Sequence, residues 1–188
     1  MERSLMTQLE QFVSATEMLR QDHRKVKRLF RDFQDAKMAA KRALAEKIFG
    51  ELKVHSAVEE EVFYPAVRKL GGENEIDQAY QDHLEVELLI NELETLPAGG
   101  AFNAGFEKLI EAVTKHIEEE ESTLLPAAEN GGMDLASVGR DMALVKYREL
   151  AKSTAKKAAT PLGLGALALV GAAAALGWFL FKGEEAGS

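Results

Sequence analysis

The chain of 188 residues contains no cysteine. Without thiols it can form no disulfide, thiolate zinc site, iron–sulfur cluster or thioether-linked haem. It also lacks an excess of basic residues, because 23 Lys and Arg stand against 31 Asp and Glu, for a formal net charge of -8. An acidic chain offers no positive surface for nucleic acid. Any bound metal must therefore be held by nitrogen and oxygen atoms, and we expect no nucleic-acid partner.

The N-terminal segment lacks the pattern of an export signal. Glu2, Glu10 and several glutamines interrupt its apolar residues, whereas an export signal has a basic start followed by an apolar run. The spacing of Leu5, Leu9 and Phe12 instead predicts a short amphipathic segment over residues 1–15 that lies against the rest of the fold. We therefore expect the domain that follows to stay in the cytoplasm.

Glycine and proline divide the remaining chain into long stretches with helical periodicity. The strong breaks are Gly71-Gly72, Pro97–Gly100, Gly131-Gly132 and Thr160-Pro161. Between them, apolar residues recur at alternating steps of three and four, which predicts helices at about 16–36, 38–70, 75–96 and 103–130. The fold class is thus all-α, an antiparallel up-down four-helix bundle over residues 16–130. A fifth helix within residues 131–160 is predicted to be a connector.

All four histidines of the chain fall on the predicted inner faces of these helices, one per helix: His23, His55, His83 and His116. Glu59 and Glu120 each follow a histidine by four residues, so the two side chains share a helix face. A carboxylate in an apolar seam is costly unless a cation is near. The seams contain no Lys or Arg, and Lys27 is expected to reach outward. The pattern therefore predicts a bound metal, and a bundle whose polar residues only satisfy one another is less favoured.

An internal repeat links the two halves of the bundle. Gln21-Asp22-His23 recurs 60 residues later as Gln81-Asp82-His83, and the segment from His55 to Ala66 matches His116 to Ala127 at an interval of 61. Two helix pairs with equivalent ligand sets are expected to be related by an approximate twofold axis. A site on that axis would hold two metal ions.

The order His, His-x-x-x-Glu, His, His-x-x-x-Glu, followed by Glu-Glu and Phe-Tyr-Pro or Leu-Leu-Pro, resembles the hemerythrin-like family, the HHE cation-binding domain. The resemblance spans about Glu17 to Leu150. It implies that the four histidines are terminal ligands and that Glu59 and Glu120 bridge two iron ions. Imidazole with carboxylate suits iron first, and manganese or zinc second.

Two positions depart from the oxygen-carrying hemerythrins. Glu87 stands one turn after His83, where those proteins have a fifth histidine, and Glu121 is an alternative to Glu120 as the last carboxylate. An additional carboxylate ligand at Glu87 would stabilise ferric iron and disfavour reversible oxygen carriage. Asp22 and Asp82 could orient ligand imidazoles or be solvated, and packing is the favoured interpretation of Tyr64 and Tyr80.

These features favour a protein that reacts with or senses oxygen, peroxide or nitric oxide, and as an enzyme it would be a di-iron oxidoreductase. The alternative is a non-catalytic module for iron binding, sensing or storage. Its small-molecule partner would be a diatomic gas or peroxide, and a homo-oligomer is compatible with the pattern. The sequence names no redox partner.

The C-terminal region is predicted to cross a membrane. Leu162–Phe181 is a run of 20 uncharged residues, long enough at about 1.5 Å per residue to span the hydrocarbon core. A transmembrane helix over 161–182 and a polar tail over 183–188 follow, although a buried hairpin is an alternative. Five Lys and Arg lie between residues 146 and 157. The excess of basic residues before the span predicts a single-pass protein of the cytoplasmic membrane with its bundle in the cytoplasm.

Overall fold

The structure, a computed structural model, describes residues 14–158, and that part of the chain is helical throughout apart from short connections. Its elements are α2 (Ala15–Asp35), α3 (Met38–Val58), the π-helical turn η1 (Glu59–Phe63), α4 (Tyr64–Arg68), α5 (Glu73–Thr95), α6 (Gly100–Ser122), α7 (Leu124–Asn130) and α8 (Leu135–Ala158). The predicted helix boundaries agree with these to within a few residues. The predicted segment 1–15 lies almost entirely outside the described residues.

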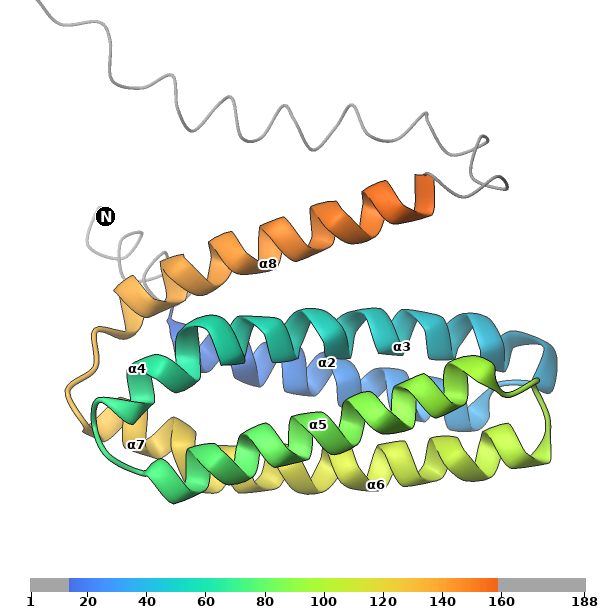
Figure 1. Cartoon of the computed structure of the whole chain (residues 1–188), viewed down its shortest axis with the longest axis horizontal. Coiled ribbons are helices and arrows are strands. Elements are labelled where there is room, and N and C mark those ends of the chain that lie inside the picture. The colour runs from blue at the N-terminus through green and yellow to red at the C-terminus, as the bar shows by residue number, and fades with distance from the viewer. Residues whose placement is uncertain (1–13, 159–188) are drawn as a thin grey trace, which may run out of the picture. The chain divides into compact units, whose positions relative to one another are not determined.

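The four long helices α2, α3, α5 and α6 run side by side in an antiparallel bundle (Figure 1). Each contacts the next in the ring, α2 against α3, α3 against α5, α5 against α6, and α6 against α2. The short connections force this up-down arrangement, because a helix can return only beside the one it leaves. The all-helical bundle predicted from the periodicity is thereby confirmed.

The core consists of two apolar clusters with the four histidines between them. One cluster fills one end of the bundle and includes Phe33 stacked on Phe106, with ring centroids 3.6 Å apart. The other fills the opposite end and includes Phe63 and Leu19. Along α2, α3 and α5 the histidine stands between a residue of one cluster and a residue of the other, and beyond His116 of α6 the second cluster is reached at Leu124 of α7. The apolar clusters therefore fix the four helices on both sides of a central polar layer.

Both halves of the bundle are irregular just after the predicted carboxylate ligands. The peptide N–H of Tyr64 donates to the carbonyl of Glu59, five residues earlier, which makes η1 a π-helical turn. In the other half the chain breaks at Thr123, with φ -124° and ψ -67°. Each irregularity precedes a proline, Pro65 or Pro126, which lacks an N–H and crowds the carbonyl four residues before it. Such π-helical turns often occur at functional sites.

Asp134 directly precedes helix α8, and its side chain accepts a hydrogen bond from the Ser137 N–H at 2.9 Å. Met142 and Val145 belong to the second apolar cluster. Lys146 Nζ lies 2.6 Å from both carboxylate oxygens of Asp22. Residues up to Glu149 belong to the same compact unit as the bundle, and Leu150–Ser188 form a second unit.

Among residues 14–158, no helix combines the length and the apolar character needed to cross a membrane. The predicted span at 161–182 and the polar tail at 183–188 lie outside the described residues.

Candidate metal centre

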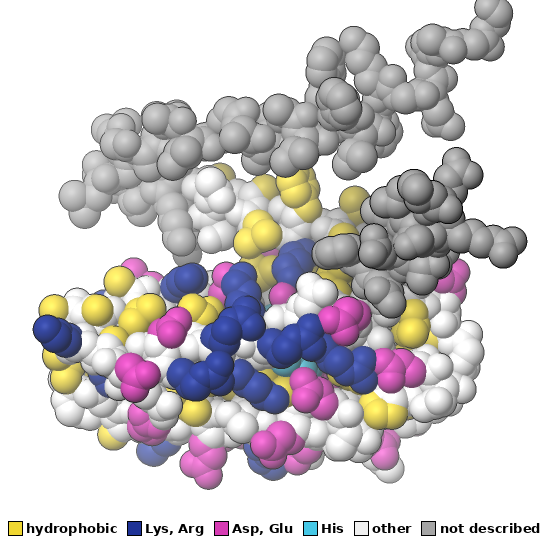
Figure 2. Space-filling model, turned by 180° about the vertical axis from the view of Figure 1, so that it is seen from behind, with side chains coloured by type: hydrophobic (Ala, Val, Ile, Leu, Met, Phe, Trp, Pro, Cys, Tyr) yellow, Lys and Arg dark blue, Asp and Glu magenta, His cyan; other side chains and the backbone are white. Residues whose placement is uncertain are grey.

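Six side chains from all four long helices and η1 meet in the middle of the bundle. They are His23, His55, Glu59, His83, His116 and Glu120, and none is more than 6% exposed. Figure 2 shows almost no histidine surface on one face of the molecule, where Lys, Arg, Asp and Glu side chains are interspersed. The structure therefore brings together every one of the six residues that the motifs predicted as a set.

The two carboxylates lie between the histidines in a crosswise arrangement. One Glu59 oxygen is 3.1 Å from His55 Nε2 and 3.3 Å from His83 Nε2. One Glu120 oxygen is 3.3 Å from His23 Nε2 and 3.5 Å from His116 Nε2. Each carboxylate thus faces one histidine from either helix pair.

The histidines themselves form two pairs. The rings of His23 and His55 lie 5.0 Å apart between centroids, and those of His83 and His116 lie 4.7 Å apart. One pair comes from α2 and α3, and the other from α5 and α6. The site therefore has two positions, each with two imidazoles, and the two carboxylates lie between these positions.

Most of the inward-facing atoms have no hydrogen-bond partner. This holds for both oxygens of Glu59, for Glu120 Oε2, and for the Nε2 atoms of His23 and His55. A buried polar atom without a partner is costly, so native structures contain few of them. Two candidate metal-binding groups are found among these residues, with the ligand atoms of each group within 4.8 Å of one another: His23, His55, Glu59 and Glu120, and Glu59, His83 and His116. This donor set of imidazole and carboxylate could hold two transition-metal ions that share Glu59.

Other carboxylates hold the outward nitrogens of these rings. Glu60 lies 2.8 Å from His83 Nδ1, and Glu121 lies 2.9 Å from His23 Nδ1. A carboxylate that accepts the Nδ1 proton of a histidine leaves Nε2 free and pointing inward. In the structure Glu120 occupies the inner position and Glu121, its predicted alternative, occupies this outer one.

Glu87 lines the same surface cavity as His83 but does not join the buried carboxylates. Its side chain is exposed and belongs to neither metal-binding group. The inward-facing residues of α5 alternate between spacings of four and three, so Ala79 and His83 are followed by Val86. Glu87, four residues after His83, therefore lies beside the inward face. Lys27, its counterpart in the repeat, forms an ion pair with Glu121 at 3.6 Å. The geometry gives no support to an additional ligand at Glu87.

Tyr64 has a role that the sequence reasoning missed. It is fully buried, donates a hydrogen bond to Glu120 Oε1 at 2.7 Å, and lies 3.1 Å from His83 Nε2. Its counterpart in the repeat is Leu125, which has no polar group. The repeat could have indicated this role, because it places a tyrosine in one half where the other half has a core leucine. A buried tyrosine hydroxyl needs a hydrogen-bond partner, and the carboxylate motif is next to it.

Protons balance the charges of the centre when no cation does. Burial and the neighbouring Glu120 carboxylate raise the pKa of Glu59 to about 8. Burial opposes the charged form of His83, yet the Glu59 and Glu60 carboxylates raise its pKa to about 10. Burial lowers the pKa of His55 and of His116. Near neutral pH, Glu59 and His83 therefore hold at least one proton between them, which a metal would displace.

Comparison with known proteins agrees with this geometry. The family described as the hemerythrin HHE cation binding domain matches residues 14–128. A solved structure of a hemerythrin HHE cation binding domain-containing protein from Mycobacterium kansasii superimposes with a TM-score of 0.69 at 22% identity, covering 78% of this chain and 93% of that one. At that identity it shows a shared fold.

A DNA nickase from Nostoc sp. is 31% identical over 123 residues, which make up 64% of this chain and 35% of the nickase. The chain thus spans about a third of that relative's length. Because the family match covers more than half of the chain, the chain belongs to the hemerythrin HHE cation binding domain family and is a helical metal-binding domain.

Proposed function

We propose that this domain binds two iron ions and reacts with or senses oxygen, peroxide or nitric oxide. His23 and His55 would hold one ion and His83 and His116 the other, with Glu59 and Glu120 as the carboxylate ligands. Manganese or zinc are the second choice, because the donor set also suits them. When bound, the iron pair supplies the redox chemistry that imidazole and carboxylate groups lack.

The observation that carries this proposal is the pair of buried carboxylates. Glu59 and Glu120 are at most 1% exposed, and the groups within ion-pair distance of them in the described chain are histidines. Two dications would neutralise both carboxylates and occupy the free nitrogens together.

A small hollow beside the histidines supports a small-molecule partner. Its volume is about 10 Å³, and its lining includes all four histidines together with Val26, Leu52 and Val113. A space of that size admits about one water-sized molecule. Its apolar walls favour an uncharged ligand such as a diatomic gas or hydrogen peroxide.

The second candidate is a non-catalytic iron sensor or store. It is favoured by the contact between Lys146 of α8 and Asp22, because Asp22 precedes the predicted ligand His23. Iron binding could thereby alter how α8 is held. The nickase activity of the Nostoc protein is not carried over, since the chain matches 35% of that protein and its net charge of -8 disfavours nucleic acid.

The metal pair can be tested by anaerobic iron loading of the whole chain. We expect about two irons per chain for the wild type and for Glu118→Gln, an exposed neighbour on the same helix. His55→Ala and Glu120→Gln should each lower the iron content. Subsequent oxygen, peroxide or nitric oxide should change the visible absorption, and repeated turnover would favour the reactive protein over the sensor or store. Unaltered loading of both ligand variants would contradict the proposed centre.

Metal binding should also release protons. Because the pKa values of Glu59 and His83 are both raised, the metal-free centre holds at least one proton near pH 7, which must leave when metal binds. We expect at least one proton released per chain, and an apparent affinity that falls as the pH is lowered. A pH indicator in weakly buffered solution measures this release during loading. Full loading without proton release would refute the assignment of these two groups as ligands.

Tyr64→Phe should leave the iron content unchanged and lower the reduction potential of the iron pair. The hydrogen bond from Tyr64 draws electron density from Glu120, so its loss strengthens the carboxylate as a donor and favours ferric iron. A bond to a charged group is worth about 1.5 kcal/mol, which corresponds to roughly 60 mV for one electron. Redox titration measures the shift, and Tyr80→Phe is the control. An unchanged potential would show that Tyr64 only fills space.

Membrane tethering through residues 161–182 remains a proposal from the sequence. The full chain, expressed in bacterial cells, should remain with the membrane fraction after an alkaline carbonate wash. A chain ending at residue 158 should be released. Recovery of the full chain in the soluble fraction would contradict the tether.

A further inference from the structure

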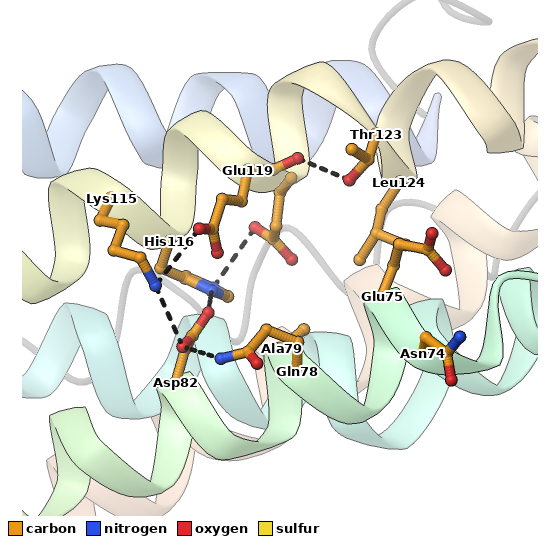
Figure 3. A pocket seen from close by; sticks show the side chains of 11 residues that line it. Asn74, Glu75, Gln78, Ala79, Asp82, Lys115, His116, Glu119, Thr123 and Leu124 are labelled. Carbon is orange, nitrogen blue, oxygen red and sulfur yellow. Dashed lines mark hydrogen bonds and ion pairs between the residues drawn. The ribbon is translucent and has the colours of Figure 1, made fainter.

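A cavity between α5 and α6 leads from the surface to the metal centre. Its volume is about 390 Å³, and its lining includes both His116 and Glu120. Figure 3 shows Glu119, Lys115 and Asp82 around it, with His116 behind them. The two buried groups of the centre are thus reached from solvent through this cavity.

Carboxylates follow one another along this route. Glu119 pairs with Lys115 Nζ at 3.2 Å, and Asp82 Oδ1 lies 3.9 Å from the same atom. The other oxygen of Asp82 is 3.5 Å from His116 Nδ1. Lys115 is the exposed member, with 61% of its side chain accessible. A cation could replace its ammonium group between the two carboxylates without any change in the buried helices.

The inner end of the cavity carries a free ligand atom. Glu120 is 1% exposed, lines the cavity, and its Oε2 has no hydrogen-bond partner. A cation that passes Glu119 and Asp82 would therefore next meet a carboxylate oxygen that faces two histidines and accepts no hydrogen bond.

Among residues 14–158, the corresponding face between α2 and α3 carries no such row of charged side chains. By the repeat, Glu119 corresponds to Val58 and Lys115 to Val54, which are both buried. Val58 shares its apolar cluster with Met142 and Val145 of α8. Asp22, the counterpart of Asp82, is held by Lys146. Of the two faces related by the repeat, the α5–α6 face is therefore the polar and open one, and the α2–α3 face is not.

A second cavity, of about 420 Å³ between α3 and α5, also touches the centre, at His83. There the accessible Nδ1 of His83 already faces Glu60, and much of the lining is apolar, including Leu52, Leu84 and Ile90. That cavity lacks the free inner carboxylate oxygen found beneath Asp82. The charge and the free ligand atom both favour the α5–α6 cavity for a cation.

We propose that divalent metal ions reach the centre through the α5–α6 cavity. Glu119 and Asp82 bind the ion in transit, and the ion displaces the ammonium group of Lys115 from between them. This inference rests on the proposed metal centre. It predicts that uptake kinetics depend on residues that are not ligands in the loaded protein.

Stopped-flow mixing of the metal-free chain with cobalt(II) chloride tests the route, since the visible absorption of bound cobalt reports uptake. Glu119→Gln should slow uptake by roughly 3- to 10-fold at low salt, because it weakens the attraction of the cavity for a cation. Lys115→Met should speed it by a similar factor. Added salt should reduce both differences. Glu118→Gln, whose exposed side chain does not line the cavity, should match the wild type.

The final cobalt content separates the two proposals. Equal content with altered rates in the Glu119 and Lys115 variants supports the route. Equal rates in all four proteins, with full final content, would overturn the route and leave the centre standing. A wild type that binds no cobalt or iron at all would overturn the centre and the route together.

Discussion

Two buried carboxylates that pair with histidines, and with no Lys or Arg of the described residues, are the constraint on which the rest of the structure depends. Glu59 and Glu120 lie at most 1% exposed between two apolar clusters, where a lone negative charge is strongly unfavourable. The helices meet this constraint by placing one imidazole each around the pair, and Glu60 and Glu121 hold two of these rings from outside. The four helices thereby enclose a site, between the histidines and the two carboxylates, that favours a bound cation.

The repeat supplies two similar halves, and the differences between them distinguish the two metal positions. Tyr64 bonds to Glu120, while its counterpart Leu125 only packs. The Nδ1 atoms of His55 and His116 both lack a hydrogen bond, but Asp82 lies 3.5 Å from that of His116, whereas its counterpart Asp22 is held by Lys146. The position beside His83 and His116 would therefore have one more carboxylate near it, which gives the two ions unequal environments.

The sequence predicted the bundle and the six inner residues, because both depend on local periodicity. Alternating steps of three and four set which residues face inward, and the histidines and glutamates occupied those steps. The prediction for Glu87 rested on its four-residue spacing from His83 and on the place of a fifth histidine in the oxygen carriers, whereas the residue that follows His83 into the core is Val86. The contacts of Tyr64 and of Lys146 with Asp22 depend on how α4 and α8 pack on distant helices, so spacing along the chain could not show them.

Anomalous X-ray diffraction at the iron edge from crystals of the loaded chain tests the central claim most directly. The account predicts two peaks about 3.5–4 Å apart, one beside His23 and His55 and the other beside His83 and His116, with Glu59 and Glu120 between them. A single peak, or peaks away from these residues, would contradict it.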